Sequence, residues 1–505
     1  MANAHFLRLT HAQVRDGSWL EIARSAWLRG EIGLVLVEPE PSADAELRAA
    51  VATMIASNGS YEAGDRAVIH ARPAALDMGC ETATQLIARG VETTVVFGMA
   101  SLGHEVGRLI QAAQAAARRA GKGPGAQAAG AGDEASVAAS HEAKAGGSDE
   151  AKASASLDLS HADPAIIEGV ADCYRQLLAP FEANGRGHWI VPIGTAPDPD
   201  PAHVPAIDFF MKVAGRGLAG IGPMRNDGRI RSHDIWLAPS MLDVDRLNEG
   251  LPAEKRWTLE EWRSLIFRSM AVSADELRRL ALAIEGVELT IHASRKGGTL
   301  HYQREDGTDF RYKVKDRPVI LDCGAVGVNS LGGTTAYRSA ITNQPTTEVF
   351  VAPLEDSLQG VIVYTQPQRA AHGVIRAPYR IEVRAGRVIG VEAPDEESVR
   401  ILRNYTGLEP YDRKPLAGDE AEAFRLRGVI AEMAIAGFNP AMMPEVRSGR
   451  LRPVTGLVLT DEKVGDHQAF GSNDQFMGAT PSAYGGEHVE HTDFVGSIER
   501  MMKLE

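Results

Sequence analysis

Apolar residues in the first half of the chain occur in short runs that alternate with stretches of helical periodicity. Such runs, rich in β-branched residues, are typical of buried strands, and they occur at residues 32–37, 66–70, 91–97, 188–193 and 287–292. Helical stretches lie at 81–88 and 165–178, and capping boxes open two more at Thr258 and Ser273. Alternating strands and helices predict a parallel sheet with crossover helices. We therefore expect an α/β domain over residues 1–295.

The second half of the chain has apolar runs that follow one another without helices, at residues 299–303, 310–314, 318–321, 349–352 and 361–364. Alternating apolar residues on either side of Ala385-Gly386 predict a hairpin over 379–392. One helix is expected over 420–436, because Gly437 ends its periodic pattern. The fold class expected for residues 296–505 is α+β and mainly antiparallel β.

Two segments of the first half do not fit this alternation. Residues 115–158 are almost all Ala, Gly, Ser, Lys, Glu and Asp. Because so few apolar side chains cannot offset the entropy of ordering, we expect a disordered insertion there. The stretch 197–254, rich in Asp, Arg and Pro, is expected to be irregular. No glycine-rich turn directly follows a predicted strand, which argues against a nucleotide-binding fold.

Composition narrows the possible function classes. The 505 residues carry a formal net charge of −14, which argues against nucleic-acid binding because that affinity comes mainly from Lys and Arg. No run of eighteen apolar residues and no secretory signal occurs, so we expect a cytoplasmic protein that does not bind a membrane. The widely spaced Cys80, Cys173 and Cys323 are interpreted as buried thiols.

Potential metal ligands concentrate between Thr460 and Met501. His491-x-Asp493 places an imidazole and a carboxylate on one side of an extended backbone. His467 follows the acidic pair Asp461-Glu462. Imidazoles and carboxylates suit zinc, manganese, cobalt or ferrous iron. A solvated polar loop is the ordinary alternative for motifs as short as these.

Two carboxylates further upstream strengthen the metal interpretation. Glu432 lies beside the apolar stripe of the helix expected over 420–436, where a buried carboxylate must be protonated, ion-paired or metal-bound. Glu348 opens the strand expected at 349–352, and functional groups often lie at such loop ends. A glutamate that reaches out to solvent is the alternative at both positions.

Five motifs, in the same order, resemble the aminopeptidase T and aminopeptidase S family of metallopeptidases. They are Gly307-Thr308-Asp309-Phe310, Asn343 to Pro353, Ala431-Glu432, Asp461-Glu462 with His467-Gln468-Ala469-Phe470-Gly471, and His491-Thr492-Asp493. The resemblance implies an N-terminal α/β domain, a β-rich metal domain and a homodimer. It also implies metal-dependent hydrolysis like that of leucyl aminopeptidases, which remove N-terminal residues from peptides, or cleavage of a related amide.

The same resemblance implies which side chains form the site. Two divalent metal ions (zinc, cobalt or manganese) would be held by Glu348, Glu432, His467, His491 and Asp493. Glu462 falls on the family's acidic position that orients or deprotonates the metal-bound water. The family has a tyrosine seven residues after the first histidine, and this chain has Asp474 there. Tyr484 is the candidate to replace that tyrosine, and Asp474 is a candidate to bind the substrate's ammonium group.

A different chemistry stays open at this point. His467, His491 and Asp493 are also a two-histidine, one-carboxylate set, the facial triad of mononuclear ferrous oxygenases. The 2,5-dihydroxypyridine dioxygenases, a distant branch similar to this peptidase family, use such a site with Fe(II). Loss of the family tyrosine favours this alternative, whereas the presence of Glu348 and Glu432 favours the hydrolase. A binding module without chemistry is a third possibility, but it would be expected to have lost a ligand. The metal and the exact substrate are not determined by the sequence.

Overall fold

The computed structural model describes residues 5–19, 21–22, 25, 33–97, 164–195, 216–328, 331, 338–339, 341–370, 372–454, 460–473 and 491–505. The insertion predicted at 115–158 lies outside these residues. Among the described helices, none has the length and apolar character needed to cross a membrane.

Strands of the first half form a seven-stranded sheet that one strand of the second half extends. The order is β1-β2-β4-β3-β5-β6-β12, and the strands are β1 (His5–Thr10), β2 (Gly33–Glu38), β3 (Arg66–Ala71), β4 (Glu92–Phe97), β5 (Gly187–Ile193), β6 (Ile230–Leu237) and β12 (Ile341–Gln344). All neighbours pair in parallel except β2 and β4, which are antiparallel. The expected parallel sheet is therefore confirmed except at this pair.

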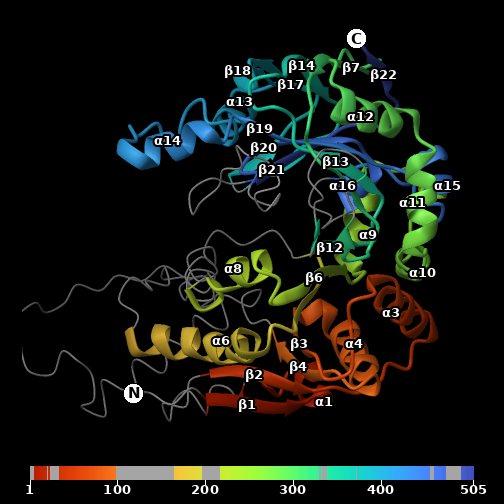
Figure 1. The fold of residues 1–505 in the computed structure, drawn as a ribbon, viewed down its shortest axis with the longest axis vertical. Coiled ribbons are helices and arrows are strands. Elements are labelled where there is room, and N and C mark those ends of the chain that lie inside the picture. Colours follow the sequence, from red (N-terminus) through yellow and green to blue (C-terminus); the bar gives the residue numbers. More distant parts are fainter. Residues whose placement is uncertain are drawn as a thin grey trace, which may run out of the picture.

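Helices pack on this sheet: α1 (His11–Arg15), α3 (Ala45–Asn58), α4 (Leu76–Ala88), α6 (Pro164–Asn184), α8 (Ile221–Asn226), α9 (Met241–Asn248) and α10 (Leu259–Met270), with short 3₁₀ turns at η1 (Pro73–Ala75) and η4 (Ala253–Lys255). α4 contacts β3, β4 and β5, and α6 contacts β1, β2, β3 and β5 (Figure 1). The capping box predicted at Thr258 is present at the start of α10. Buried apolar side chains between Leu9 and Met270 form one hydrophobic cluster, which Met442, Leu451 and Val464 join.

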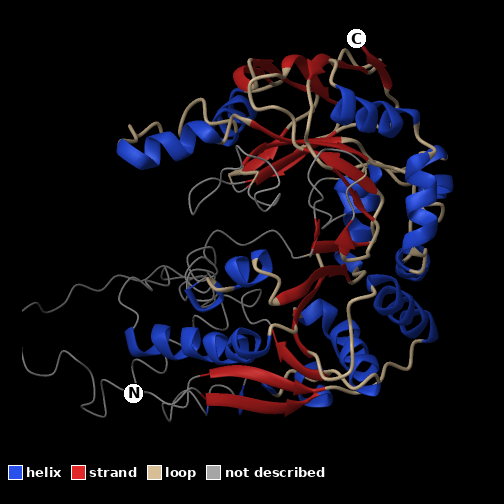
Figure 2. Cartoon of the chain, in the orientation of Figure 1, coloured by secondary structure: helices blue, strands red, loops and turns tan. Residues whose placement is uncertain are grey.

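Two antiparallel sheets form the core of the second half. Their orders are β21-β20-β19-β13-β9 and β18-β17-β14-β8-β7-β22. The strands are β7 (Leu300–Gln303), β8 (Asp309–Tyr312), β9 (Val319–Asp322), β13 (Glu348–Val351), β14 (Gln359–Tyr364), β17 (Tyr379–Arg384), β18 (Arg387–Glu392), β19 (Ile430–Ile435), β20 (His467–Gly471), β21 (His491–Val495) and β22 (Met501–Leu504). Figure 2 shows one sheet above the other, and Phe310 of one and Phe470 of the other share a buried cluster. The mainly antiparallel character of this half is confirmed.

Smaller elements complete the second half. Two short pairs join β10 (Gly327–Val328) to β11 (Arg338–Ser339) and β15 (Gln368–Ala370) to β16 (Gly373–Ile375). Its helices are α13 (Glu396–Tyr405), α14 (Gly418–Leu426), α15 (Met443–Arg447) and α16 (Thr460–Val464). Two helices that precede it in sequence, α11 (Ala274–Leu282) and α12 (Glu285–Lys296), pack in its hydrophobic cluster. The predicted hairpin is β17–β18, whose turn residues Ala385 and Gly386 have φ of 48° and 71°. A domain boundary at residue 295 stays a prediction.

Three predicted elements are wrong. Residues 287–292 lie in α12, not in a strand, and the helix predicted over 420–436 ends with α14, after which β19 carries Glu432. Short apolar runs fit a buried helix or a buried strand equally well, and β19 is buried along its whole length between β13 and β20. The third wrong prediction is the stretch 197–254, which was expected to be irregular but contains the strand β6. Buried polar residues such as Ser232 and Asp234 interrupt the apolar run of this strand.

Candidate metal centre

Three buried side chains converge on the five-stranded sheet. Glu348 on β13, Glu432 on β19 and His467 on β20 are 4%, 4% and 1% exposed. Nε2 of His467 lies 3.2 Å from Oε1 of Glu432 and 3.5 Å from Oε2 of Glu348. Ligand atoms held about 2.0–2.1 Å from an ion in tetrahedral geometry lie roughly 3.4 Å apart. The two carboxylates and the imidazole therefore have the chemistry and spacing to bind a divalent metal ion.

Strand register explains why residues so far apart in sequence meet. Residues directly opposite one another in an antiparallel pair share a face of the sheet. Glu432 pairs with Ala469, which pairs in turn with Asp493. His467 lies two residues before Ala469 and so has the same face, and the small alanine leaves room between the longer side chains. A bulge between Ile430 and Glu432 re-aims this part of β19, as bulges often do near functional sites.

A buried lysine adds a positive charge to the cluster. Lys463 on α16 is fully buried, and its Nζ forms an ion pair with Oε1 of Glu348 and lies 3.5 Å from Oε2 of Glu462. Asp322, at the end of β9, pairs with Glu348 across the two strands. Sequence reasoning missed both Lys463 and Asp322. The position of Lys463 directly after Glu462 was the available signal, but lysines in polar motifs are ordinarily exposed to solvent.

The charges of the cluster act strongly on one another. Burial lowers the pKa of His467, but the hydrogen bond with Glu432 and the negative charges of Glu348 and Asp493 outweigh it and raise the pKa to about 10. Burial raises the pKa of Asp322 to about 7, with Lys463 opposing the rise and Glu348 adding to it. Burial lowers the pKa of Lys463, but the neighbouring carboxylates raise it above its ordinary value. Without a metal ion, the cluster therefore holds protons that metal binding has to displace.

A buried network positions His467. Asp466, the preceding residue, is fully buried and accepts hydrogen bonds from Oη of Tyr302 at 2.6 Å and from the backbone N–H of Ala436 at 3.0 Å. The guanidinium of Arg500 also donates to it. Because these partners come from β7, from the end of β19 and from the segment before β22, they tie the start of β20 to three other parts of the second half.

The structure describes only some of the other predicted site residues. The side chain of Glu462 is 24% exposed at the edge of the cluster. Asp493 lies on β21, close enough for its charge to act on His467. The backbone of His491 pairs with Gly471 on β20, but its side chain lies outside what the structure describes, and so do Asp474 and Tyr484.

Comparison with known proteins points to one family. Residues 290–404 match the family model of the thermophilic metalloprotease (M29). Aminopeptidase AmpS of Bacillus subtilis (strain 168) is 31% identical over 105 residues, which are 21% of this chain and 23% of that protein. This alignment thus spans about a quarter of the curated relative. The family match includes Glu348 but ends before Glu432 and His467.

One solved structure shares the fold over nearly the whole chain. Wild-type AmpT from Thermus thermophilus superposes with a TM-score of 0.56 and 18% identity, covering 90% of this chain and 94% of that one. A 2,5-dihydroxypyridine dioxygenase from Pseudomonas putida KT2440 reaches a TM-score of 0.42 and 13% identity over 91% and 93% of the two chains. The chain is therefore similar to the thermophilic metalloprotease (M29) family over residues 290–404, and it shares its overall fold with AmpT.

Proposed function

We propose that this protein is a metal-dependent aminopeptidase that removes the N-terminal residue of a small peptide. The observation that carries the proposal is the convergence of Glu348, Glu432 and His467, whose ligand atoms all lie within 4.8 Å of one another. Buried carboxylates that face one another need a compensating cation. A metal site is the arrangement that satisfies this need and also matches the chemistry of the related aminopeptidases.

In this proposal the ligands are Glu348, Glu432 and His467, joined by His491 and Asp493 from β21. A bound divalent ion would lower the pKa of its water towards neutrality and polarise the scissile carbonyl. The finer form of the proposal, taken from the family resemblance, has two such ions of zinc, cobalt or manganese. Oε1 of Glu348 is engaged by Lys463, which leaves its Oε2 directed at the imidazole of His467.

Glu462 is proposed to move the proton. Its carboxylate is more exposed than those of Glu348 and Glu432, so substrate and water can reach it. The ammonium of Lys463, 3.5 Å away, restrains the carboxylate. Glu462 can then accept a proton from water and transfer it to the leaving amine. Asp474 stays the candidate for binding the substrate's ammonium group, and Tyr484 the candidate for stabilising the transition state.

The ferrous dioxygenase alternative is not proposed. A two-histidine, one-carboxylate site needs neither Glu348 nor Glu432, yet both are buried beside His467. A homodimer and a cytoplasmic location, both expected from the sequence, are further proposals. Size-exclusion chromatography with light scattering tests the first, and fractionation of source cells tests the second.

Metal removal tests the proposed function. The protein is treated with a chelator, and its hydrolysis of a leucyl anilide and its metal content by mass spectrometry are measured before and after zinc, cobalt or manganese is restored. We expect activity to disappear and return with the metal. Glu432→Gln should lower activity by more than about 100-fold, because even outer-shell partners of metal ligands contribute 10–100-fold. The matched variant Glu420→Gln, on the exposed surface of α14, should behave as wild type.

Two results would contradict the proposal. One is full activity in the metal-free protein. The other is one iron per chain together with oxygen uptake on a dihydroxypyridine, which would establish the dioxygenase chemistry instead.

A further inference from the structure

A pocket lined by arginines lies apart from the three converging ligands. Its volume is about 260 Å³, and it is lined by Arg246 and Glu249 at the end of α9, by Pro367 and Arg369 around the start of β15, and by Arg452 and Val454. This is smaller than the roughly 300–1,000 Å³ of pockets that hold drug-sized ligands. It has room for a group of about one amino-acid residue.

The charge of this pocket favours an anion. Among the described residues that line it are three arginines, Arg246, Arg369 and Arg452, and one carboxylate, that of Glu249, whose Oε1 lies 3.4 Å from Nη2 of Arg369. Arg452 donates to the backbone carbonyl of Glu249, which carries no full charge. Its Nε is buried and has no hydrogen-bond partner within the described part of the chain. Guanidinium groups present paired N–H donors that match the two oxygens of a carboxylate.

The walls of the pocket are linked to the candidate metal centre. Gln368, between the two lining residues Pro367 and Arg369, donates from Nε2 to the backbone oxygen of Asp493 at 2.8 Å. The charge of Asp493 acts in turn on His467. Val454, another lining residue, is followed six residues later by the start of α16, which carries Glu462 and Lys463.

We propose that this pocket binds the free C-terminal carboxylate of a short peptide whose N-terminal peptide bond lies at the metal centre. This inference rests on the proposed aminopeptidase function and adds a substrate class to it, namely short peptides with a free C-terminus. The three arginines hold the carboxylate, and the apolar rim of Pro367 and Val454 contacts the last residue of the substrate. Binding at both ends would select peptides by length.

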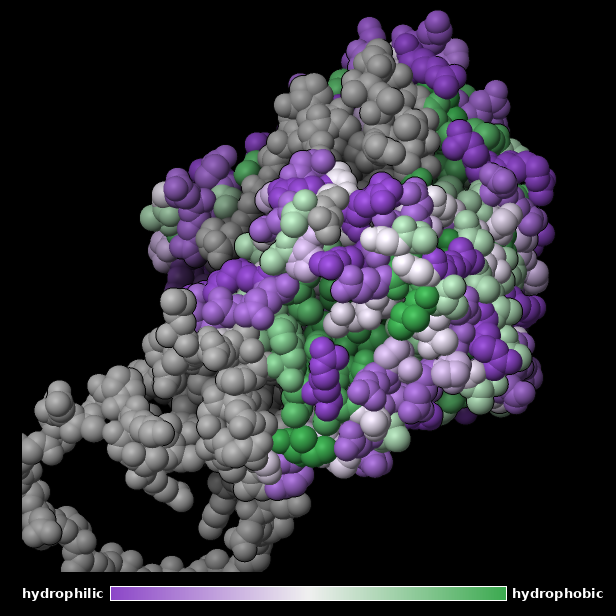
Figure 3. Space-filling model, turned by 60° about the horizontal axis from the view of Figure 1, so that its bottom comes forward, coloured by the Kyte–Doolittle hydropathy of each residue, from purple (hydrophilic) through white to green (hydrophobic). Residues whose placement is uncertain are grey.

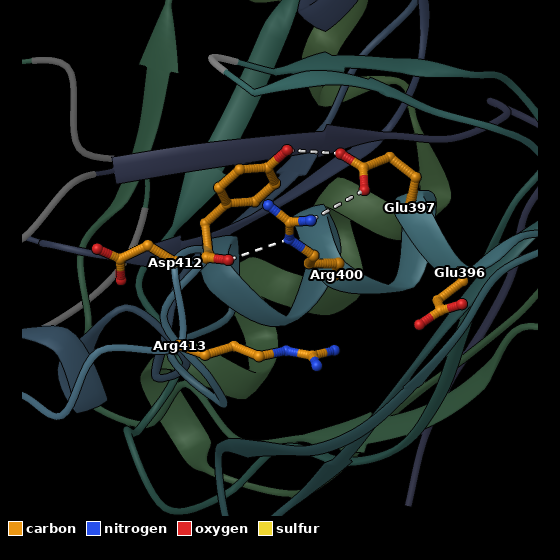
Figure 4. Close-up of a pocket in the computed structure, with 6 residues that line it drawn as sticks. Glu396, Glu397, Arg400, Asp412 and Arg413 are labelled. Atoms are coloured by element: carbon orange, nitrogen blue, oxygen red, sulfur yellow. Dashed lines mark hydrogen bonds and ion pairs between the residues drawn. The ribbon is translucent and has the colours of Figure 1, made fainter.

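Two other surfaces formed by the described residues lack this combination. The pocket of about 550 Å³ beside α13, shown in Figure 4, is lined by the acidic Glu396, Glu397 and Asp412 and by the basic Arg400 and Arg413. There Glu397 is already engaged by Arg400, at 3.6 Å, and by the hydroxyl of Tyr411, at 2.6 Å. For the hydrophobic strip in Figure 3, no contact of the described residues indicates an occupant.

Matched peptides test the inference. Leu-Gly, Leu-Gly-Gly and Leu-Gly-Gly-Gly are assayed as free acids and as C-terminal amides, with metal-loaded wild type, Arg369→Gln, Arg452→Gln and the control Arg376→Gln. Arg376 is exposed and lies outside the pocket. We expect wild type to prefer the free acid by about 10-fold or more in kcat/KM at one length, because a hydrogen bond to a charged group contributes about 1.5–3 kcal/mol. The preference should disappear in both pocket variants, through a higher KM with kcat retained, and should persist in the control.

The outcomes separate this inference from the proposed function. Hydrolysis of a leucyl anilide, which has no carboxylate, should be the same in wild type and in both pocket variants. If wild type cleaves the anilide but treats acids and amides alike at every length, the inference is wrong and the proposed function stands. If wild type cleaves neither anilide nor peptides, the proposed function fails and the inference falls with it. Thermal melts identify a variant that does not fold. Because Arg369 and Arg452 lie in different segments and are changed separately, the other variant still tests the inference if one of them fails to fold.

Discussion

Two buried polar groups, one in each half of the molecule, differ in how their charges are compensated. In the seven-stranded sheet, Nε2 of His188 lies 2.9 Å from Oδ2 of Asp65, and Nδ1 lies 3.0 Å from Oγ of Ser232. The hydroxyl of Ser232 donates to Oδ2 of Asp234 at 3.0 Å. All four residues are fully buried. They have the composition of a catalytic triad, but burial keeps any substrate away from them.

Asp234 in this network is surrounded by donors. Besides Ser232, it accepts hydrogen bonds from Nδ2 of Asn58 at 3.0 Å, from Oγ1 of Thr342 at 2.6 Å and from the hydroxyl of Tyr61. Thr342 belongs to β12, the strand that the second half contributes to this sheet. Neutral donors therefore compensate the buried carboxylate, and the network ties the two halves of the chain together.

The metal cluster is organised in the opposite way. The carboxylates of Glu348 and Glu432 direct acceptor oxygens at the imidazole of His467, and the ammonium of Lys463 compensates only one side of Glu348. Both groups are equally buried, so burial alone does not mark a functional site. The arrangement of donors and acceptors does: matched donors indicate a structural network, and converging acceptors indicate a site for a cation.

Replacing Lys463 by methionine should lower the free energy of unfolding more than any change in the buried network around Asp234. The change removes the cation that contacts Glu348, and breaking a buried ion pair by removing one partner costs about 3–5 kcal/mol. We expect a fall of this size in the free energy of unfolding of the metal-free protein, measured by urea denaturation. Added metal should recover part of it, because the ion supplies positive charge. The control Lys503→Met, at an exposed position, should change the stability little, and equal stabilities of the two variants would refute the role of Lys463.

Asp234→Ala should have a smaller effect that is confined to stability. The substitution leaves the donors of Asn58, Thr342 and Tyr61 without their acceptor, and buried unsatisfied groups cost about 1–3 kcal/mol each. We expect a loss of about 3 kcal/mol, since the remaining groups can rearrange, with kcat per folded molecule unchanged. Asp227→Ala, in an exposed turn, is the matched control. Loss of kcat in folded Asp234→Ala protein would show that the network also serves the site.

The smallest expected effect is the loss of stability that His70 causes as the pH falls. His70 on β3 lies 3.0 Å from the hydroxyl of Tyr174, and burial, assisted by Arg72, lowers its pKa to about 4 from the ordinary 6.5. The folded state therefore favours the neutral ring. Its contribution to stability is complete above pH 6.5 and is lost progressively as the pH falls towards 4.

Urea denaturation at pH 7.0 and 5.0 measures this loss. His70→Gln should reduce the difference between the two pH values, because glutamine does not titrate. Part of the difference should persist, since burial also lowers the pKa of His233 to about 4. A difference that is unchanged in His70→Gln would assign the pH dependence to other groups.

Local pattern alone predicted much of the molecule. Runs of β-branched residues marked β2, β3, β4 and β5, and a turn able to adopt positive φ marked the hairpin at Ala385-Gly386. Glu348 was predicted at the start of a strand, and β13 begins there. These features depend on residues close together in sequence, so their periodicity and turn chemistry are visible without the fold.

Only the tertiary structure determined the surroundings of the candidate site. Glu432 lies on a strand because β13 and β20 flank its segment, and a short apolar run does not distinguish a buried strand from a buried helix. Lys463 contacts Glu348 across 115 residues of sequence, and Asp322 joins the cluster through the pairing of β9 with β13. The sequence by itself determined which residues can bind a metal ion. The strand register determined which of them meet, because contacts between distant segments depend on the packing of the whole chain.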